Sequence, residues 1–355
     1  MTRTAHRPEP APPPQEPLPE ATPAVELRSV SRGFGDVKAL DDLTLVAPAH
    51  SITVLLGPNG AGKTTAIRMI TGALNPDDGS VTVFGLDPSV DGEEVRTRCG
   101  VVSAKPALYD RLSGWDNLGY AAELYGLGRG DAAATAIRES AARFGIDDAL
   151  DQQVGGYSTG MKTRLALARS VMHGPDLLLF DEPTSGLDPE SSHAVLELIR
   201  EMADTGSTVV MCTHLLLEAE GLAEQVVVLD GGTDLIAGSP DALTKQFWPN
   251  QVVRLHAEDP AGLDRLADLD GVLAFDRDER GLAASGSGAD AGGATVQLDD
   301  LSRVPELVFA LAAAGVRVTR VEPHLPSLED LYFAVRDGRG AFSERGHGKA
   351  AEVAA

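Results

Sequence analysis

Cysteine is scarce in this sequence, which has only two cysteines among its 355 residues. They form neither a CxxC pair nor a Cys/His cluster, so a zinc site or a disulfide framework is not expected. Cys99 and Cys212 both lie beside apolar runs. We therefore predict two buried free thiols in a protein of a reducing compartment, the cytosol.

Positive charge is also in short supply. Lysine and arginine number 30 against 53 aspartates and glutamates, which gives a formal net charge of −23 and an isoelectric point of about 4.6. Broad nucleic-acid binding needs a basic face, so this balance argues against a nucleic-acid partner. It argues equally against direct binding to an anionic membrane surface.

Long apolar runs are missing as well. No stretch approaches the roughly 18 to 20 apolar residues that a membrane span needs. The first residues lack the apolar core of a secretory signal. We therefore expect a chain that is soluble by itself and that reaches a membrane only through a partner protein.

Hydrophobic residues make up 43% of the sequence, which is enough for a large core. Apolar runs alternate with other patterns along the chain. Residues 1–23 are rich in proline and glutamate and predict a disordered tail. Between residues 24 and 240, apolar runs typical of buried parallel strands alternate with helical patterns. The runs are residues 51–57, 176–180, 207–213 and 225–230, and the helical patterns are Lys63–Ala73, Asp131–Phe144, Ser158–His173 and Glu190–Asp204. This alternation predicts an α/β domain with a central sheet, and "VELRSV" and "GSVTVFG" resemble antiparallel additions to it.

A second, smaller module is predicted over residues 245–339. Its strand and helix patterns follow the order β-α-β-β-α-β, which is consistent with a ferredoxin-like α+β module. A last helix, "SLEDLYFAV", is expected to close this module. Residues 340–355 are predicted to be a disordered tail.

The stretch "GPNGAGKTT" from Gly57 to Thr65 carries the clearest chemistry. It fits G-x-x-x-x-G-K-[ST] in full, and it lies between an apolar strand and a helical pattern. Glycines let backbone N–H groups close around phosphate oxygens, and the helix N-terminus adds partial positive charge. We expect Lys63 to reach the β- and γ-phosphates and the Thr64 hydroxyl to bind Mg²⁺.

Two adjacent carboxylates form the second element of a phosphate site. The run "LLLF" delivers Asp181 and Glu182 to the end of a strand. Asp181 suits a Mg²⁺ ligand, and Glu182 suits the general base that polarises an attacking water. A guanine reader of the form Asn-Lys-x-Asp is absent, which argues against a GTPase.

Several motifs in a fixed order make the chain resemble the nucleotide-binding subunit of an ABC transporter over about residues 25–240. "GPNGAGKTT" matches the Walker A loop, "YSTGM" the signature motif, "LLLFDEP" Walker B, "SGLD" the D-loop and "CTH" the switch histidine. The resemblance implies a P-loop ATPase fold with an antiparallel β subdomain and a helical subdomain. The residues it implies for ATP binding are Phe34, Gly57, Pro58, Asn59, Gly60, Ala61, Gly62, Lys63, Thr64 and Thr65.

The remaining implied roles concern hydrolysis and a second subunit. Glu182, His214 and Lys63 would be catalytic, and Thr64 and Asp181 would hold Mg²⁺. Two subunits, most simply two copies of this chain, would face head to tail. The signature residues of one would then contact ATP on the other, and Asp188 would cross the interface. The signature residues are Ser158, Thr159, Gly160 and Met161.

The segments after residue 238 resemble the drug-export, daunorubicin-resistance-like branch of this family. "GSPDAL", the small α/β module and "PSLEDLYFAV" carry that resemblance. It implies a separate membrane permease as partner and a place on the cytoplasmic face of the cell membrane. The transported substrate is selected by the permease and is not readable from this chain.

The sequence departs from the family pattern at two positions. Alignment on Gly100 and "PALYDRL" places Ala104 where the family usually has a glutamine that touches Mg²⁺. Alanine offers no ligand atom, and a charged Lys105 beside it has no lone pair. Thr159 stands where the family most often has glycine, but Gly160 is kept. We expect slower or less tightly coupled hydrolysis from the first departure and retained function despite the second.

Two alternatives stay open. The chain could be a catalytically weak ATP-binding regulatory subunit, for which Ala104 is the motive. It could also be a non-transport ABC ATPase of translation or DNA repair, although it carries one cassette and no coiled-coil insertion.

Overall fold

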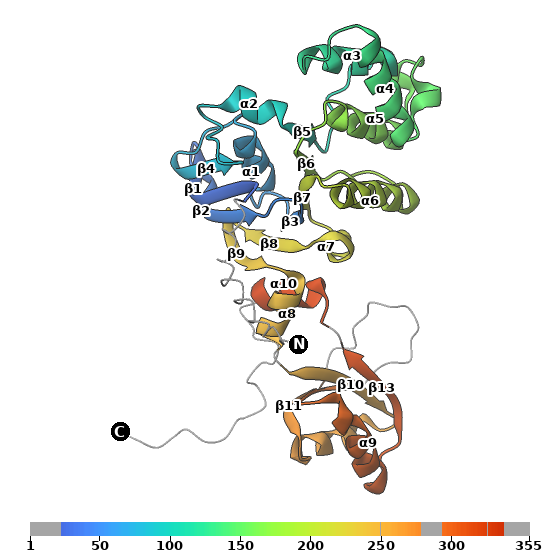
Figure 1. The fold of residues 1–355 in the computed structure, drawn as a ribbon. Coiled ribbons are helices and arrows are strands. Elements are labelled where there is room, and N and C mark those ends of the chain that lie inside the picture. The colour runs from blue at the N-terminus through green and yellow to red at the C-terminus, as the bar shows by residue number, and fades with distance from the viewer. Residues whose placement is uncertain (1–22, 249, 278–292, 325, 337–355) are drawn as a thin grey trace, which may run out of the picture.

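The computed structural model describes residues 23–248, 250–277, 293–324 and 326–336 (Figure 1). The predicted tail over residues 340–355 lies outside the described residues, and so does the predicted tail over residues 1–23 apart from Pro23. The described chain forms three sheets of six, three and four strands. The first two belong to the region predicted as an α/β domain, and the third belongs to the smaller module.

The central six-stranded sheet has the order β5-β6-β7-β3-β8-β9 and is parallel except for β9. Its strands are β3 (Ile52–Leu56), β5 (Cys99–Val102), β6 (Leu177–Asp181), β7 (Thr208–Thr213), β8 (Gln225–Asp230) and β9 (Thr233–Gly238). Every residue of β3, β6 and β7 is buried, as expected of a parallel sheet that is covered on both faces. The four apolar runs of the sequence are β3, β6, β7 and β8, whereas β5 and β9 were not predicted.

The three-stranded sheet is antiparallel; the sequence pattern predicted its strands at "VELRSV" and "GSVTVFG" but not the strand over residues 37–47. It has the order β2-β1-β4 and contains β1 (Val25–Phe34), β2 (Val37–Ala47) and β4 (Asp78–Val83). Its apolar side chains share one core with alternate residues of β6, such as Leu177 and Leu179. This sheet therefore covers one face of the central sheet.

Helices complete the α/β region (Figure 1). They are α1 (Lys63–Ile70), α2 (Gly92–Thr97), α3 (Gly114–Leu124), α4 (Asp131–Arg143), α5 (Thr159–Val171), α6 (Pro189–Asp204), α7 (Leu216–Leu222) and α8 (Pro240–Phe247). Short 3₁₀ turns lie at Asp147–Ala149 and Val154–Gly156. The helices α3, α4 and α5 pack on one another and form the helical unit that the resemblance implied.

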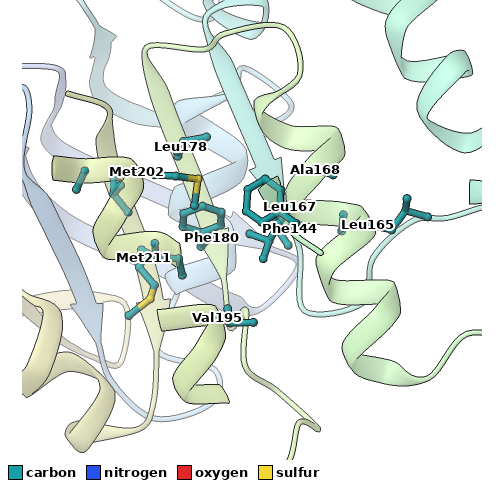
Figure 2. Close-up of a cluster of buried hydrophobic side chains, with 14 of the residues drawn as sticks. Phe144, Leu165, Leu167, Ala168, Leu178, Phe180, Val195, Met202 and Met211 are labelled. Carbon is teal, nitrogen blue, oxygen red and sulfur yellow. The ribbon is translucent and has the colours of Figure 1, made fainter. Parts of the chain in front are cut away.

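The helical unit is joined to the strand that ends at the two candidate carboxylates. Phe180 of β6 is fully buried and belongs to the same core as Phe144, Leu167 and Met202. Figure 2 shows these side chains gathered between β6, α5 and α6. The strand that ends at Asp181 is therefore anchored in a fully buried core.

The smaller module has the strand order and direction of a ferredoxin-like sheet. Its elements are β10 (Gln251–Ala257), the 3₁₀ segment η3 (Pro260–Asp268), β11 (Val272–Arg277), β12 (Gly293–Leu298), η4 (Leu301–Arg303), α9 (Val304–Ala313) and β13 (Val318–His324). The order is β11-β12-β10-β13 and every pair is antiparallel. The first predicted helix is a 3₁₀ run over Pro260–Asp268, and its first turn contains Gly262, a residue that weakens a helix.

The last helix corrects one expectation. The sequence predicted that "SLEDLYFAV" closes the smaller module, but α10 (Leu328–Arg336) packs on α7, α8 and β9 of the α/β region (Figure 1). Leu328 and Leu331 are buried in the same core as Phe180. The amphipathic pattern of α10 indicated a buried face, but it could not indicate which unit supplied the partner.

Candidate functional site

The phosphate loop connects β3 to α1 and depends on glycine at defined points. A Cβ on Gly57 would lie 2.3 Å from the Leu229 carbonyl oxygen, so no larger residue fits there without a backbone shift. Gly62 precedes α1 with a φ of 102°, a left-handed conformation that strongly favours glycine. Asn59 and Gly60 are exposed at the tip of the loop, and Ala61 is buried beneath it. The loop thus has the shape that lets backbone N–H groups point at an anion.

Lys63 is buried at the start of α1, with its ammonium group directed over this loop. Its Nζ donates to the carbonyl oxygens of Gly57 at 2.7 Å and Pro58 at 3.2 Å. It also lies 3.5 Å from Glu182 Oε1. The structure therefore places the lysine of the phosphate loop beside the carboxylate that the sequence proposed as general base.

Thr64 and Asp181 converge from α1 and β6. The Thr64 hydroxyl donates to Asp181 Oδ2 at 2.8 Å, and Asp181 is buried. A hydroxyl and a carboxylate are hard oxygen donors of the kind that Mg²⁺ prefers, so these two residues fit the ion. Among the described residues, no cluster of three or more His, Cys, Asp or Glu side chains forms an all-protein metal site. Mg²⁺ usually completes its shell with phosphate and water.

Glu182 has a backbone conformation that is unusual for its residue type. Its φ is 52°, in the left-handed region, which costs on the order of 1–3 kcal/mol outside glycine. Its N–H donates to the Cys212 carbonyl of β7 at 2.9 Å, which holds the strained turn against the neighbouring strand. The side chain of Glu182 contacts His214 on its other side, with His214 Nδ1 3.1 Å from Glu182 Oε2. Lys63, Glu182 and His214 therefore form one continuous set of polar contacts.

Cys212 lies in β7 beside the contact set of Lys63, Glu182 and His214, and its thiol is unreactive. Both cysteines are buried free thiols, as predicted. Burial raises the pKa of the Cys212 thiol well above its ordinary value, and the nearby Asp181 carboxylate acts in the same direction. Burial likewise raises the pKa of Cys99 to about 12. Neither thiol is therefore available as a thiolate nucleophile at neutral pH.

A cavity of about 650 Å³ opens beside the Thr64–Asp181 pair. Its lining includes Thr64, Asp181, Ala104 and Lys105. Ala104 follows the end of β5 and is exposed in this cavity. The position at which the sequence lacks the expected glutamine therefore lines the same cavity as the candidate Mg²⁺ ligands.

The signature residues begin α5. Ser158 is its N-cap, and the Ser158 hydroxyl accepts a hydrogen bond from the Met161 N–H at 3.2 Å. Ser158 and Thr159 are exposed, and Gly160 and Met161 are half-buried. A Cβ on Gly160 would meet no atom closer than 3.6 Å, so packing within this subunit does not require glycine at that position.

Asp188 and Phe34 also lie on the surface. Asp188 caps α6 by accepting from the Ser191 N–H at 2.9 Å and the Ser191 hydroxyl at 2.7 Å, and these bonds lower its pKa. Phe34 ends β1 with 48% of its surface exposed, and the Arg32 guanidinium lies 5.3 Å from its ring centre. Both side chains are therefore accessible to a ligand or a partner subunit.

The structure adds two residues that the sequence did not single out. Thr184 and Glu218 are buried just behind Glu182 and His214, and they are hydrogen-bonded to each other at 2.6 Å. Glu218 follows His214 by four residues, at the start of α7 (Leu216–Leu222), and this spacing in the sequence was the signal by which Glu218 could have been found.

Comparison with known proteins agrees with the family resemblance of the sequence motifs. Residues 40–185 match the family model described as ABC transporter. The chain is 38% identical over 224 residues to the ABC transporter ATP-binding protein NatA of Bacillus subtilis, covering 62% of this chain and 91% of that relative. It is 37% identical over 273 residues to the daunorubicin/doxorubicin resistance ATP-binding protein DrrA of Streptomyces peucetius, with shares of 75% and 81%.

Similarity also extends beyond the α/β region. The daunorubicin resistance ATP-binding protein DrrA2 of Streptomyces coeruleorubidus is 34% identical over 320 residues, with shares of 89% and 96%. Among solved structures, an ATP-binding subunit of an ABC transporter superposes with a TM-score of 0.58 at 30% identity, covering 63% of this chain and 93% of that one. Within the described residues, no helix is both long and apolar enough to span a membrane.

Proposed function

Because the chain belongs to the ATP-binding proteins of ABC transporters, we propose that it is the ATP-hydrolysing subunit of an exporter for drug-like or antibiotic-like molecules. The ATPase domain of this family couples ATP hydrolysis to transport. The contact set of Lys63, Glu182 and His214 supports hydrolysis by this chain. The similarity to a daunorubicin resistance protein over 89% of the chain supports export, since it reaches past the α/β region.

In the proposed reaction, each residue of the contact set has one task. Lys63 neutralises charge on the transferred phosphoryl group, and Glu182 polarises the attacking water. His214 holds the Glu182 carboxylate through its ring nitrogen, 3.1 Å away. Mg²⁺ bound by Thr64 and Asp181 would supply further positive charge at the phosphate oxygens. The aromatic ring of Phe34 would stack on the adenine.

The proposal includes a head-to-tail dimer of two copies of this chain. Ser158 and Asp188 are exposed at helix starts on this subunit, where they are free to meet a partner. ATP would then join the phosphate loop of one copy to the start of α5 in the other, and hydrolysis would release the pair. A separate membrane permease would hold the dimer at the cytoplasmic face of the cell membrane.

Transport measurements test this function directly. Inverted vesicles that contain the full chain and its membrane permease should accumulate daunorubicin when ATP is added. Vesicles with Lys63→Ala should not, because that ammonium group is required at the phosphates. ATP hydrolysis without any ATP-dependent accumulation of daunorubicin would contradict the drug-export assignment.

Ala104 supports a second candidate, a regulatory subunit with weak catalysis. Ala104 lines the same cavity as Thr64 and Asp181 and has no ligand atom, so one polar contact of the usual family pattern is missing. The ATP turnover of the wild-type chain distinguishes this candidate from the first.

We expect Ala104→Gln to raise the rate of permease-stimulated ATP hydrolysis about fivefold, the equivalent of about 1 kcal/mol from one added hydrogen bond. Steady-state phosphate release, with and without permease, measures this change. Ala132→Gln on the exposed side of α4 is the control, because it adds the same side chain away from the site. Identical basal and stimulated rates in Ala104→Gln and wild type would refute the idea that this position limits coupling.

A further inference from the structure

A buried carboxylate is hydrogen-bonded to two residues that lie close in the chain to Glu182 and His214. Glu218 is in the first turn of α7 and is only 7% exposed. The Thr184 hydroxyl donates to Glu218 Oε1 at 2.6 Å, and the Thr213 hydroxyl donates to Glu218 Oε2 at 2.8 Å. Burying a carboxylate is costly unless it is hydrogen-bonded, so these two donors are what makes the position tolerable.

The two donors come from the two loops that carry the candidate catalytic side chains. Thr184 follows Glu182 by two residues at the end of β6, and Thr213 precedes His214 at the end of β7. Both threonines are themselves buried. Glu218 therefore links the chain just after the proposed base to the chain just before the switch histidine.

The hydroxyl of Thr213 also closes the turn that contains His214. Its Oγ1 accepts from the Leu215 N–H at 3.0 Å while its proton is donated to Glu218. His214 itself is 40% exposed, so packing alone does little to fix its ring. The turn that carries His214 is thus anchored to Glu218, and the ring itself contacts Glu182 Oε2.

We propose that Glu218 is a positioning residue for ATP hydrolysis, which holds the β6 and β7 loops in register so that His214 and Glu182 stay in contact. This inference rests on the proposed roles of Glu182 and His214. Glu218 touches neither reacting atoms nor phosphate and acts only through the hydroxyls of Thr184 and Thr213. This anchor adds to the Glu182–Cys212 backbone bond in holding the left-handed backbone at Glu182, because a strained turn persists only where its surroundings hold it.

Replacing Glu218 by alanine in the full chain tests the proposal. We expect kcat for ATP hydrolysis to fall by about ten- to a hundredfold, as for a displacement of catalytic groups by about 1 Å. The KM for ATP should stay the same, because the phosphate loop is not changed. Glu220→Ala is the matched control, since Glu220 is an exposed glutamate on the same helix.

Two further variants separate positioning from a loss of folding. Glu218→Gln keeps the volume and can still accept from one threonine and donate to the other, so it should recover most of the lost rate. Thr184→Val keeps the shape but removes one donor, so it should lower kcat without changing the KM. In both Glu218→Ala and Thr184→Val, the NMR signals of the His214 ring should shift, whereas Glu220→Ala should leave them in place.

The outcomes are distinct. A wild-type kcat in Glu218→Ala, together with slow turnover in Glu182→Gln, would overturn the positioning role and leave the proposed function standing. Glu218→Ala could instead lose kcat, ATP affinity and melting temperature together, with no shift of the His214 NMR signal and no recovery in Glu218→Gln. That result would overturn the positioning role in favour of a purely structural one. Wild-type turnover in Glu182→Gln would instead refute the catalytic assignment on which the inference rests.

Discussion

Glu182→Gln is expected to lower the rate of ATP hydrolysis by about 10²- to 10⁴-fold, the usual contribution of a general base. Glutamine keeps the size of the side chain and can still contact Lys63 and His214, so the site should remain assembled. It cannot polarise the attacking water in the same way, because the amide carries no negative charge. Single-turnover phosphate release measures the chemical step directly.

ATP binding should survive this substitution, since the phosphate loop and the Thr64–Asp181 pair are unchanged. The variant should therefore accumulate as an ATP-bound dimer, which size-exclusion chromatography with light scattering would detect. Glu220→Gln serves as the control for the loss of one carboxylate at an exposed position outside the site. Normal hydrolysis in Glu182→Gln would show that another group is the base.

Ser158→Arg is the second change for which we expect a large effect. The hydroxyl of Ser158 caps α5 and is exposed, and an arginine there would fill the space in which we propose that the partner's γ-phosphate lies. We expect hydrolysis to fall by about a hundredfold or more through the lost alignment of the composite site. ATP binding to the isolated subunit, measured by equilibrium dialysis, should be nearly unchanged.

The control for Ser158→Arg must lose an equivalent helix cap. Ser239 caps α8 by accepting from the Ala242 N–H at 3.3 Å, so Ser239→Arg removes the same kind of interaction. Both variants should lose about 1 kcal/mol of stability from the cap, but only Ser158→Arg should lose hydrolysis. If Ser158→Arg abolished ATP binding to the monomer, the assignment of Ser158 to a partner's site would be wrong.

Mixing two inactive variants gives a sharper test of the same assignment. A dimer of one Ser158→Arg copy and one Lys63→Ala copy keeps one composite site with both an intact phosphate loop and an intact signature. Such mixtures should regain part of the wild-type rate, whereas each variant alone should stay inactive. A site contained within one subunit would give no recovery on mixing.

The sequence predicted those parts of the site that depend on residues close together along the chain. The phosphate loop, Asp181 and Glu182 were found because each motif follows an apolar run that can be recognised as a buried strand. The capping role of Ser158 was also local, since Ser158 and Met161 are three residues apart. What these residues do for a partner subunit came from family resemblance and stays a proposal.

Features that depend on distant partners could not be predicted in this way. Thr184 and Glu218 are 34 residues apart and meet only because β6 and β7 are neighbours in the sheet. The packing of α10 was predicted wrongly for the same reason, because its apolar face fits any complementary surface. The strands β2 and β9 were missed because each has exposed or half-buried positions that weaken its apolar pattern.

The position of α10 changes how the chain is best divided. Helices α8 and α10 pack on each other, so the ferredoxin-like module leaves the ATPase unit and returns to it at nearly the same place. The module is therefore an insertion in an otherwise continuous ATPase unit rather than an appended C-terminal domain. A deletion variant that lacks only the ferredoxin-like module would join α8 to α10 by a short linker and keep the buried Leu328 and Leu331 in place. Truncation after α8 would instead remove part of the ATPase core itself.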